Sequence, residues 1–458
     1  MARRKVLKIT PILVTLNILV LLLIICYYSF RLVKYYKLEN GTTKENETVL
    51  LVKEVLKKQS YVDLTQGLIH NEEDNTYTYL GNIDDNYIEY SGNLFRIIGV
   101  DSSNNIRAVS ENSLTLMYSG LEKGYNDSYV NKWLNVTKLD NSGVFENTLY
   151  DSKKILTTTD MCSDVIDDLT NITCNEINKD NKITLLSLYD YAESGGKSGF
   201  LNNGENYYLS TLDSNNNNYY INSDGEVGIN QVTTKIYGVR PVITINSQTI
   251  LLSGNGTKDN PYKIESHDIK TLNDVYVGNY IEFNNDVYKV INKYDDTVRV
   301  AATSVLKNNE ENLLYRYCST NLYNYKSGVG KYLNYDFYEG IPNNDLIKAS
   351  YWYIGKSSLA NLDYSNMYSS KSSAYIGFLA LGDLYVNDLN NIFTLTPGIE
   401  SDEIINVITQ EGNIYGDSVS SKYNIRIAFN LDNTINISNG IGTIDSPYVL
   451  GVDDEKEE

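Results

Sequence analysis

The residues that most often carry catalysis are scarce in this sequence. Of 458 residues only two are histidines, His70 and His267, and both lie in polar stretches between the predicted structural elements. A serine or cysteine nucleophile needs a general base within hydrogen-bond reach, and histidine is the usual base. A histidine-based zinc site likewise needs several such ligands. The sequence therefore predicts neither nucleophilic catalysis nor a histidine–zinc site.

Two short stretches have parts of ligand-binding loops. Gly195–Ser198 (GGKS) has the end of a phosphate-binding loop, but Tyr191 stands where that loop needs its first glycine. Asp213–Asp224 (DSNNNNYYINSD) offers many oxygen ligands and could hold calcium. It lacks the glycine and the terminal glutamate of a calcium-binding loop, and a solvated surface loop explains it equally well. We expect no nucleotide site, and calcium is the one candidate cofactor.

Two arginines and two glutamates recur at equivalent places. Arg240 and Arg426 lie on predicted strands, and Glu89 and Glu282 belong to a duplicated hairpin. A half-buried arginine–glutamate ion pair in each copy would explain why both charges are kept, and contact with a ligand is the alternative. Carboxylate pairs of the kind that glycosidases use are too numerous to single one out. No catalytic residue is therefore predicted.

Two of the four cysteines are close in sequence. Cys162 and Cys174 could close a short loop, and in an oxidising compartment this bridge would constrain the unfolded chain by roughly 3 kcal/mol. Two separate free thiols are the alternative. Cys26 falls within an apolar run, and Cys318 stands alone in the second half of the chain.

The elements that would position these residues occur twice. Tyr237–Ile264 and Tyr423–Leu450 align without a gap, which indicates a repeated domain. The identical pairs are Tyr237/Tyr423, Arg240/Arg426, Gly254/Gly440, Gly256/Gly442, Thr257/Thr443, Asp259/Asp445, Pro261/Pro447 and Tyr262/Tyr448. Alternating apolar residues predict a strand with one buried face, on which Pro241 marks an edge or a start. The glycines that are identical in the two copies predict turns. We expect these glycines, the two arginines, Glu89 and Glu282 to have structural roles.

A predicted hairpin opens each copy. Tyr87–Ile98 (YIEYSGNLFRII) recurs as Tyr280–Ile291 (YIEFNNDVYKVI), with turn-forming residues between two β-rich runs. A third strand is expected after each hairpin, at Ile106–Ser110 and at Val298–Ala302. Each repeat should therefore begin with a short antiparallel meander.

The N-terminal part of the sequence contains a long apolar run and no copy of the repeat. Ile9–Tyr28 is nearly all apolar, and about 20 residues can span a bilayer as a helix. An uncleaved anchor is favoured over a cleaved signal peptide or a lipidated Cys26. In the stalk that follows, residues 45–59 have the apolar spacing of an amphipathic helix. The basic residues before the span place the N-terminus in the cytoplasm and the rest of the chain outside the cell.

The sequence thus predicts an α+β protein with an N-terminal transmembrane helix and two tandem, strand-rich repeats. The expected parts are a basic tail (1–8), the transmembrane helix (9–28), a stalk (29–75), a first repeat domain (76–264), a linker (265–273), a second repeat domain (274–450) and an acidic tail (451–458). With 58 acidic against 39 basic residues the net charge is -19, which repels phosphate backbones. We therefore expect a single-pass membrane protein that does not bind nucleic acid.

Four motifs of the first repeat carry a family resemblance. They are Phe95–Gly99 (FRIIG), Leu185–Tyr191 (LLSLYDY), Tyr237–Val242 (YGVRPV) and Gly254–Tyr262 (GNGTKDNPY). They resemble an uncharacterised domain family of surface proteins in low-G+C bacteria, and the second repeat is a weaker match. That family is similar to the C-type-lectin-like fold shared with formylglycine-generating enzymes, which implies two lectin-like domains. Those enzymes use a cysteine pair near the closing strand, and this chain has none there, so their activity is not implied.

The resemblance implies the fold and a surface location, and the family supplies no established function. We expect a membrane-anchored bacterial surface protein that binds or adheres to glycan, cell wall or a protein partner. An extracellular hydrolase of polysaccharide or cell wall is the first alternative, and a structural spacer of the envelope is the second. A carboxylate pair in a deep cleft would favour the hydrolase. A shallow surface lined by tyrosine, asparagine and tryptophan would favour binding, which we expect to be the function.

Overall fold

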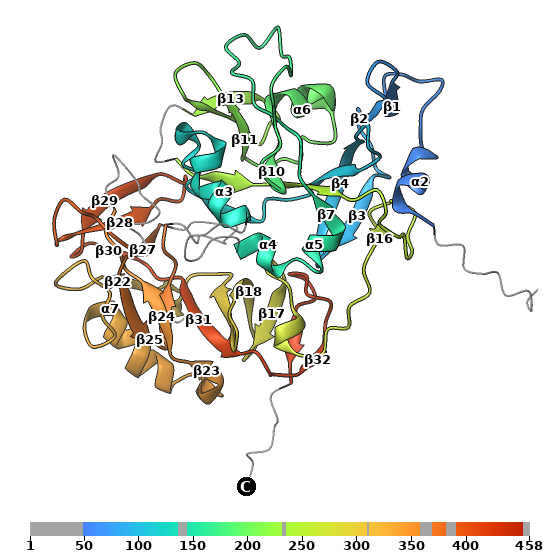
Figure 1. Ribbon diagram of the computed structural model, residues 1–458. Helices are drawn as coiled ribbons and strands as arrows, with labels where there is room; N and C mark the ends of the chain where they lie inside the picture. Colours follow the sequence, from blue (N-terminus) through green and yellow to red (C-terminus); the bar gives the residue numbers. More distant parts are fainter. Residues whose placement is uncertain are drawn as a thin grey trace, which may run out of the picture. The chain divides into compact units, whose positions relative to one another are not determined.

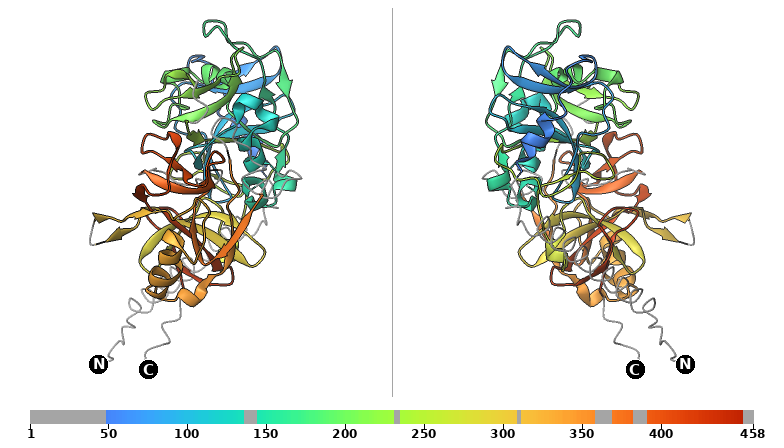
Figure 2. Two further views of the ribbon diagram at one scale, coloured as in Figure 1. Left: turned by 90° about the vertical axis from the view of Figure 1, so that its left-hand side faces the viewer. Right: turned by 90° about the vertical axis from the view of Figure 1, so that its right-hand side faces the viewer.

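One order of strands occurs twice in this protein. The computed structural model describes residues 49–135, 144–230, 235–308, 311–357, 369–381 and 391–451 (Figure 1). The residues from Leu50 onward form one compact unit. Within it the first repeat runs from blue to green and the second from yellow to red, and each gathers in its own half of the unit (Figure 2).

Each repeat contains a large sheet built on a hairpin and the strand after it. In the first repeat the order is β1 (Gly67–Asn71), β2 (Thr76–Leu80), β4 (Asn93–Val100), β5 (Ile106–Ser110), β15 (Pro241–Ile245) and β10 (Ile183–Leu185), with β3 (Tyr87–Tyr90), β7 (Leu156–Thr157) and β16 (Tyr262–Lys263) joined at the side. In the second it is β23 (Ile347–Lys348), β31 (Ile427–Asp432), β19 (Thr297–Ala302), β18 (Asp286–Lys293), β17 (Tyr280–Phe283), β33 (Tyr448–Leu450) and β32 (Ile437–Asn439), with β26 (Ile376–Phe378) on β31. The predicted hairpins and third strands are thereby confirmed.

Each repeat also has a five-stranded sheet with matching order. The first is β13 (Val227–Asn230), β12 (Asn218–Ile221), β11 (Tyr207–Leu212), β14 (Tyr237–Val239) and β6 (Thr115–Met117). The second is β29 (Ile414–Ser418), β28 (Ile404–Ile408), β27 (Ile392–Pro397), β30 (Lys422–Asn424) and β22 (Leu314–Arg316). In both sheets the third and fourth strands pair in parallel, so the duplication extends to strand direction.

The helices of the described residues are short. They are α2 (Leu51–Leu56), α3 (Tyr129–Leu134), α4 (Val144–Thr148), α5 (Ser152–Ile155), α6 (Leu188–Glu193) and α7 (Gly328–Lys331), which runs into the π-helical turn η5 (Tyr332–Phe337). Three small ladders complete the list: β8 (Met161–Cys162) with β9 (Ile177–Asn178), β20 (Lys307–Asn308) with β21 (Glu311–Asn312), and β24 (Ser350–Tyr353) with β25 (Lys371–Ala374). Side chains on strands therefore supply most of the core.

The closing strand of the repeated cassette differs from its prediction. The chain leaves the five-stranded sheet after Val239, turns at Arg240 and enters the large sheet at Pro241. Pro241 does mark a strand start, as expected for a residue without an N–H. All five residues of β15 are buried, so both of its faces are covered and the prediction of one buried face was wrong.

The expected fold class is also wrong at the N-terminus. In the described part of the chain, every helix is too short or too polar to cross a membrane. The predicted basic tail, the span 9–28 and stalk residues 29–48 lie outside the described residues, as does 452–458 of the acidic tail. The predicted amphipathic helix 45–59 is reduced to the six residues of α2. The α+β fold with a transmembrane helix is therefore replaced by a strand-rich fold of repeated sheets.

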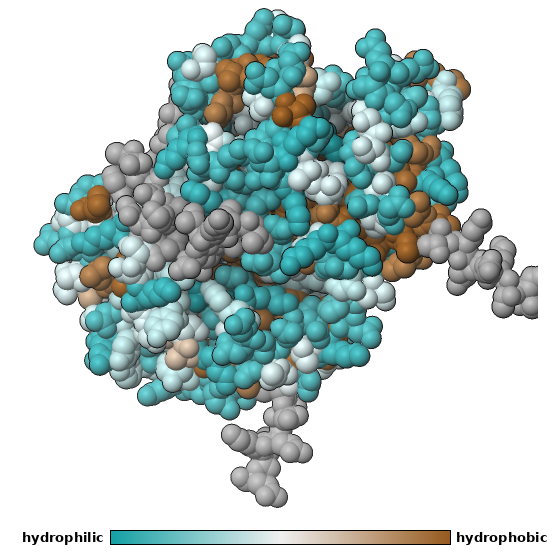
Figure 3. Space-filling view, in the orientation of Figure 1, coloured by the Kyte–Doolittle hydropathy of each residue, from teal (hydrophilic) through white to brown (hydrophobic). Residues whose placement is uncertain are grey.

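The surface drawn in Figure 3 is mainly hydrophilic, with exposed apolar side chains gathered beside α2. Val49 and Ile250 are among these exposed residues, and the bridge between Leu50 and Ile250 brings them together. Over the second repeat the same view shows few such residues.

Candidate functional site

A groove of about 810 Å³ opens at the surface of the second repeat. Its walls come from the turn between β18 and β19, from β19 and β23, from the β24–β25 ladder, and from β31 with the turn after it. These segments are far apart in sequence, and the pairing of β19, β23 and β31 in one sheet brings most of them together. We take this groove as the candidate site.

Arg299 lies at the base of the groove and is fixed on several sides. It is 6% exposed, and the antiparallel register places it opposite Asn430. Its Nε donates to Oδ1 of Asn430 at 2.8 Å, and its Nη2 donates to the carbonyl oxygen of Tyr351 at 2.9 Å. The guanidinium also lies over the rings of Trp352, at 4.2 Å, and Tyr294, at 5.0 Å. The charge therefore keeps one orientation.

Trp352, which supports Arg299 from below, is held by its own surroundings. It is 1% exposed, and its Nε1 donates to the carbonyl oxygen of Ala374 at 3.0 Å across the β24–β25 ladder. Gly377 allows this packing, because a Cβ there would lie 2.5 Å from the indole ring. Buried, hydrogen-bonded aromatic rings of this kind make a rigid floor.

Three tyrosines give the groove its aromatic surface. Tyr351 is 66% exposed, whereas Tyr294 and Tyr353 are half-buried. The Nζ of Lys371 lies 5.0 Å from the ring centre of Tyr353. Rings that are partly open to solvent offer an apolar face together with a hydroxyl, which suits ligands that are themselves amphipathic.

Two carboxylates of the described residues line the groove, Asp296 and Asp432, and the contacts of Asp432 are well defined. Asp432 accepts hydrogen bonds from the hydroxyl of Thr434 at 2.6 Å and from its N–H at 2.9 Å, and it lies 3.3 Å from Nζ of Lys348. The hydrogen bonds from Thr434 and the charge of Lys348 lower the pKa of Asp432. A glycosidase acid needs a raised pKa, so Asp432 does not have the property of such an acid.

The predicted ion pair of Arg240 with Glu89 does not form. Arg240 is 1% exposed; its Nε donates to the carbonyl oxygen of Ser110 at 3.0 Å and its Nη1 to that of Leu201 at 2.8 Å. Glu89 lies on β3, where the parallel register places it beside Lys263, 3.4 Å away. Arg240 points instead to main-chain oxygens because it lies where the chain crosses between sheets.

The other sequence-predicted residues also lie outside the groove lining. Arg426 is buried at the matching crossing between β30 and β31, and Glu282 is half-buried on β17. The cassette glycines all have positive φ: Gly254 (+95°), Gly256 (+87°), Gly440 (+93°) and Gly442 (+79°). Such angles are costly for other residues, so these glycines serve the turns.

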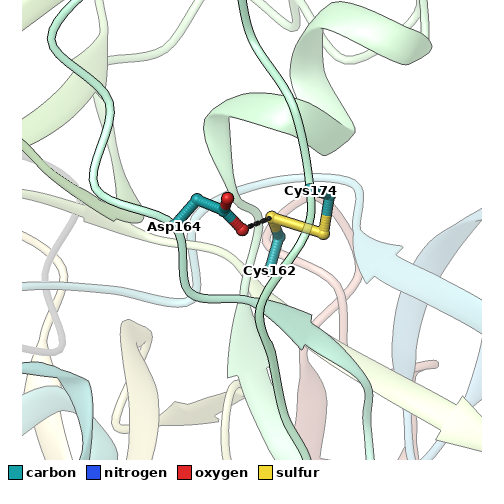
Figure 4. Close-up of side chains that lie close together, drawn as sticks. All are labelled: Cys162, Asp164 and Cys174. Carbon is teal, nitrogen blue, oxygen red and sulfur yellow. Dashed lines mark hydrogen bonds between the residues drawn. A yellow bond between two sulfur atoms is a disulfide. The ribbon is translucent and has the colours of Figure 1, made fainter.

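Cys162 and Cys174 are joined by a disulfide, with Cα atoms 5.5 Å apart (Figure 4). Asp164 lies beside it, with Oδ2 3.4 Å from Sγ of Cys162. In the described residues these three form the one group of potential metal ligands within 4.8 Å of one another. Both sulfurs are bonded to each other, and Asp164 accepts the N–H groups of Asn175 and Glu176, so the oxidised group has a structural role.

The stretch considered for calcium, Asp213–Asp224, begins with a turn in which the carboxylate of Asp213 accepts hydrogen bonds from within the turn. Asp213 accepts the N–H groups of Asn215 and Asn217 on Oδ1 and the side-chain amide of Asn217 on Oδ2. Its carboxylate thus stabilises the connection between β11 and β12. Calcium binding here stays a prediction.

Sequence reasoning missed the groove. Tyr351 and Trp352 lie on β24 and belong to no repeated motif, and Arg299 lies on a predicted strand but was not singled out as a site residue. One signal was present: the third strand of each meander carries an arginine, in Ile106–Ser110 (IRAVS) and in Val298–Ala302 (VRVAA). Comparison with known proteins finds no match for the chain among family models, curated proteins or solved structures.

Proposed function

We propose that this protein is an exported saccharide-binding protein whose second repeat holds the ligand in the groove. The observation that carries the proposal is the exposed ring of Tyr351 beside a fixed polar base made by Arg299 and Asn430. Sugars present apolar faces and many hydroxyls, and aromatic rings beside amides and charged groups match both.

Two further observations support this proposal. The disulfide of Cys162 and Cys174 is of a kind that persists in oxidising, extracellular environments. The motif resemblance to bacterial surface-protein domains points in the same direction. The lowered pKa of Asp432 argues against a role for this carboxylate as the general acid of a hydrolase.

A glycan array probed with the whole chain tests this function. We expect a defined set of saccharides to bind, and Tyr351→Ala to weaken binding about tenfold through the loss of ring contact. Tyr61→Ala is the matched control, since Tyr61 is 78% exposed and does not line the groove. An array without any bound saccharide would reject the proposal, as would binding that Tyr351→Ala leaves unchanged.

A further inference from the structure

Arg299 has a counterpart in the first repeat. Arg107 lies opposite Thr244 in the β5–β15 ladder, as Arg299 lies opposite Asn430 in the β19–β31 ladder. The ungapped alignment of the two cassettes makes Thr244 and Asn430 equivalent. The two arginines therefore occupy the same position in the two large sheets.

The two positions differ in how the charge is neutralised. Nη2 of Arg107 lies 3.0 Å from Oδ1 of Asp190, a carboxylate that also forms the capping box at the start of α6 with Ser187. Arg299 makes no ion pair with any described residue, and its close neighbours are an amide, a carbonyl oxygen and two rings. Asp383, which aligns with Asp190 in sequence, lies outside the described residues.

An arginine that is 6% exposed and has no carboxylate partner among the described residues is costly to bury, because burial removes water from the charge. The Nη1 of Arg299 donates to no described residue, and the guanidinium lines the groove. Guanidinium binds carboxylate, phosphate and sulfate groups through paired hydrogen bonds. Among the described residues of the second repeat, no carboxylate takes the place that Asp190 takes in the first, so an anion from outside could pair with Arg299 there.

The rest of the groove is compatible with an anion. Lys348 and Lys371 also line it, against Asp296 and Asp432, so with Arg299 three cations face two carboxylates. Lys348 is 3.3 Å from Asp432 and largely neutralises it. The groove therefore carries a local positive charge in a protein whose net charge is -19.

Resting on the proposed function, we propose that the saccharide in the groove is acidic: its anionic group forms an ion pair with Arg299, and its ring lies against Tyr351. The ligand supplies the carboxylate that Asp190 supplies in the first repeat. Carboxylate, phosphate and sulfate share this chemistry, and a uronate-containing oligosaccharide is the simplest probe of it.

Calorimetric titration of the whole chain tests this inference with one oligogalacturonate in two forms, free acid and methyl ester. We expect the free acid to bind about 10- to 100-fold more tightly, which is the range for a charge-assisted hydrogen-bond pair. Phosphate- and sulfate-bearing saccharides in separate titrations identify the preferred anion. A preference for either of these over the uronate keeps Arg299 as the anion site and changes only the ligand.

Variants complete the test. Arg299→Gln is expected to bind acid and ester equally, and Arg299→Lys to keep part of the preference because it retains charge without the planar fork. Lys326→Gln is the control, since Lys326 is exposed, lies in the same repeat and does not line the groove. Equal binding of acid and ester by the unaltered chain would overturn the inference and leave the proposed function intact. No binding of any saccharide would reject both.

Discussion

The guanidinium of Arg299 lines the groove and lies 4.2 Å from the ring centre of Trp352, which is buried behind it. Both side chains are buried, and each is hydrogen-bonded across a strand pair. A binding surface that is ordered before the ligand arrives loses less conformational entropy on binding. The strength of the site should therefore depend on residues that never touch the ligand.

Gly377 is such a residue. Gly377→Ala would place a Cβ 2.5 Å from the indole of Trp352, so the ring must move. We expect a loss of about 1–3 kcal/mol in the free energy of unfolding, the usual range for overpacking. Urea unfolding measures this. Gly340→Ala is the control, because its Cβ would meet only ordinary contacts from 3.4 Å outward, and an equal loss in both variants would contradict the argument.

The cassette glycines should respond alike in the two repeats. A Cβ at Gly254 would lie 1.9 Å from the carbonyl oxygen of Pro261, and one at Gly440 would lie 1.9 Å from that of Pro447. We expect each alanine variant to lose roughly 2–4 kcal/mol, from backbone strain plus the clash. Thermal unfolding followed by circular dichroism measures it.

Gly204→Ala separates strain from clash in that experiment. Gly204 also has a positive φ (+81°), but a Cβ there has no atom within 4 Å. We expect this variant to lose only about 1 kcal/mol. If it lost as much as Gly254→Ala, the close approach of the proline carbonyl would not be the cause.

Glu265 should make stability depend on pH. Its Oε1 accepts the N–H of Ser91 at 2.7 Å, and burial raises its pKa from 4.5 to about 7. The folded chain therefore holds this proton more tightly than the unfolded chain, so stability falls as pH rises from about 4.5 to about 7. Glu265→Gln mimics the protonated form and should be more stable at pH ~8 by roughly 1–2 kcal/mol, after allowance for solvent screening. Urea unfolding at both ends of this range checks it, and an advantage already present at the acid end would speak against burial as the cause.

The disulfide should stabilise the first repeat through its loop. Cys162 and Cys174 are separated by 12 residues in sequence. Replacing both by serine should cost about 3 kcal/mol, because the unfolded chain regains freedom. A reducing agent should lower the free energy of unfolding of the unaltered chain to that of the double variant. It should leave the free energy of unfolding of the double variant unchanged. Cys318→Ser, which removes the free thiol found among the described residues, is the control. Equal stability of the oxidised chain and the double variant would show that the loop is held by its other contacts.

The sequence predicted the parts of the fold that local patterns decide. Tyr87–Ile98 and Tyr280–Ile291 form hairpins because alternating apolar residues and turn residues act within a few positions. The passage from one sheet to another at Arg240 was missed, because a break between two strands depends on which neighbours each one pairs with. The failed ion pair of Arg240 follows from the same break.

The groove was beyond sequence reasoning for a related reason. Tyr294, Trp352 and Asn430 become neighbours of Arg299 only through strand pairing and packing across the sheet. No spacing along the chain marks them as one group. The arginine on each third strand was visible, but its different role in the two repeats depends on the contact that Arg107 makes with Asp190.

The parallel pairing of β16 with β3, and of β33 with β17, has a consequence for how such proteins grow. Tyr262 pairs with Ile88 and Tyr448 with Ile281, so each repeat ends beside the first strand of its duplicated hairpin. A copy inserted at that point adds length to the chain and leaves the ladders of its neighbours undisturbed. Gene duplication can therefore lengthen this protein one repeat at a time.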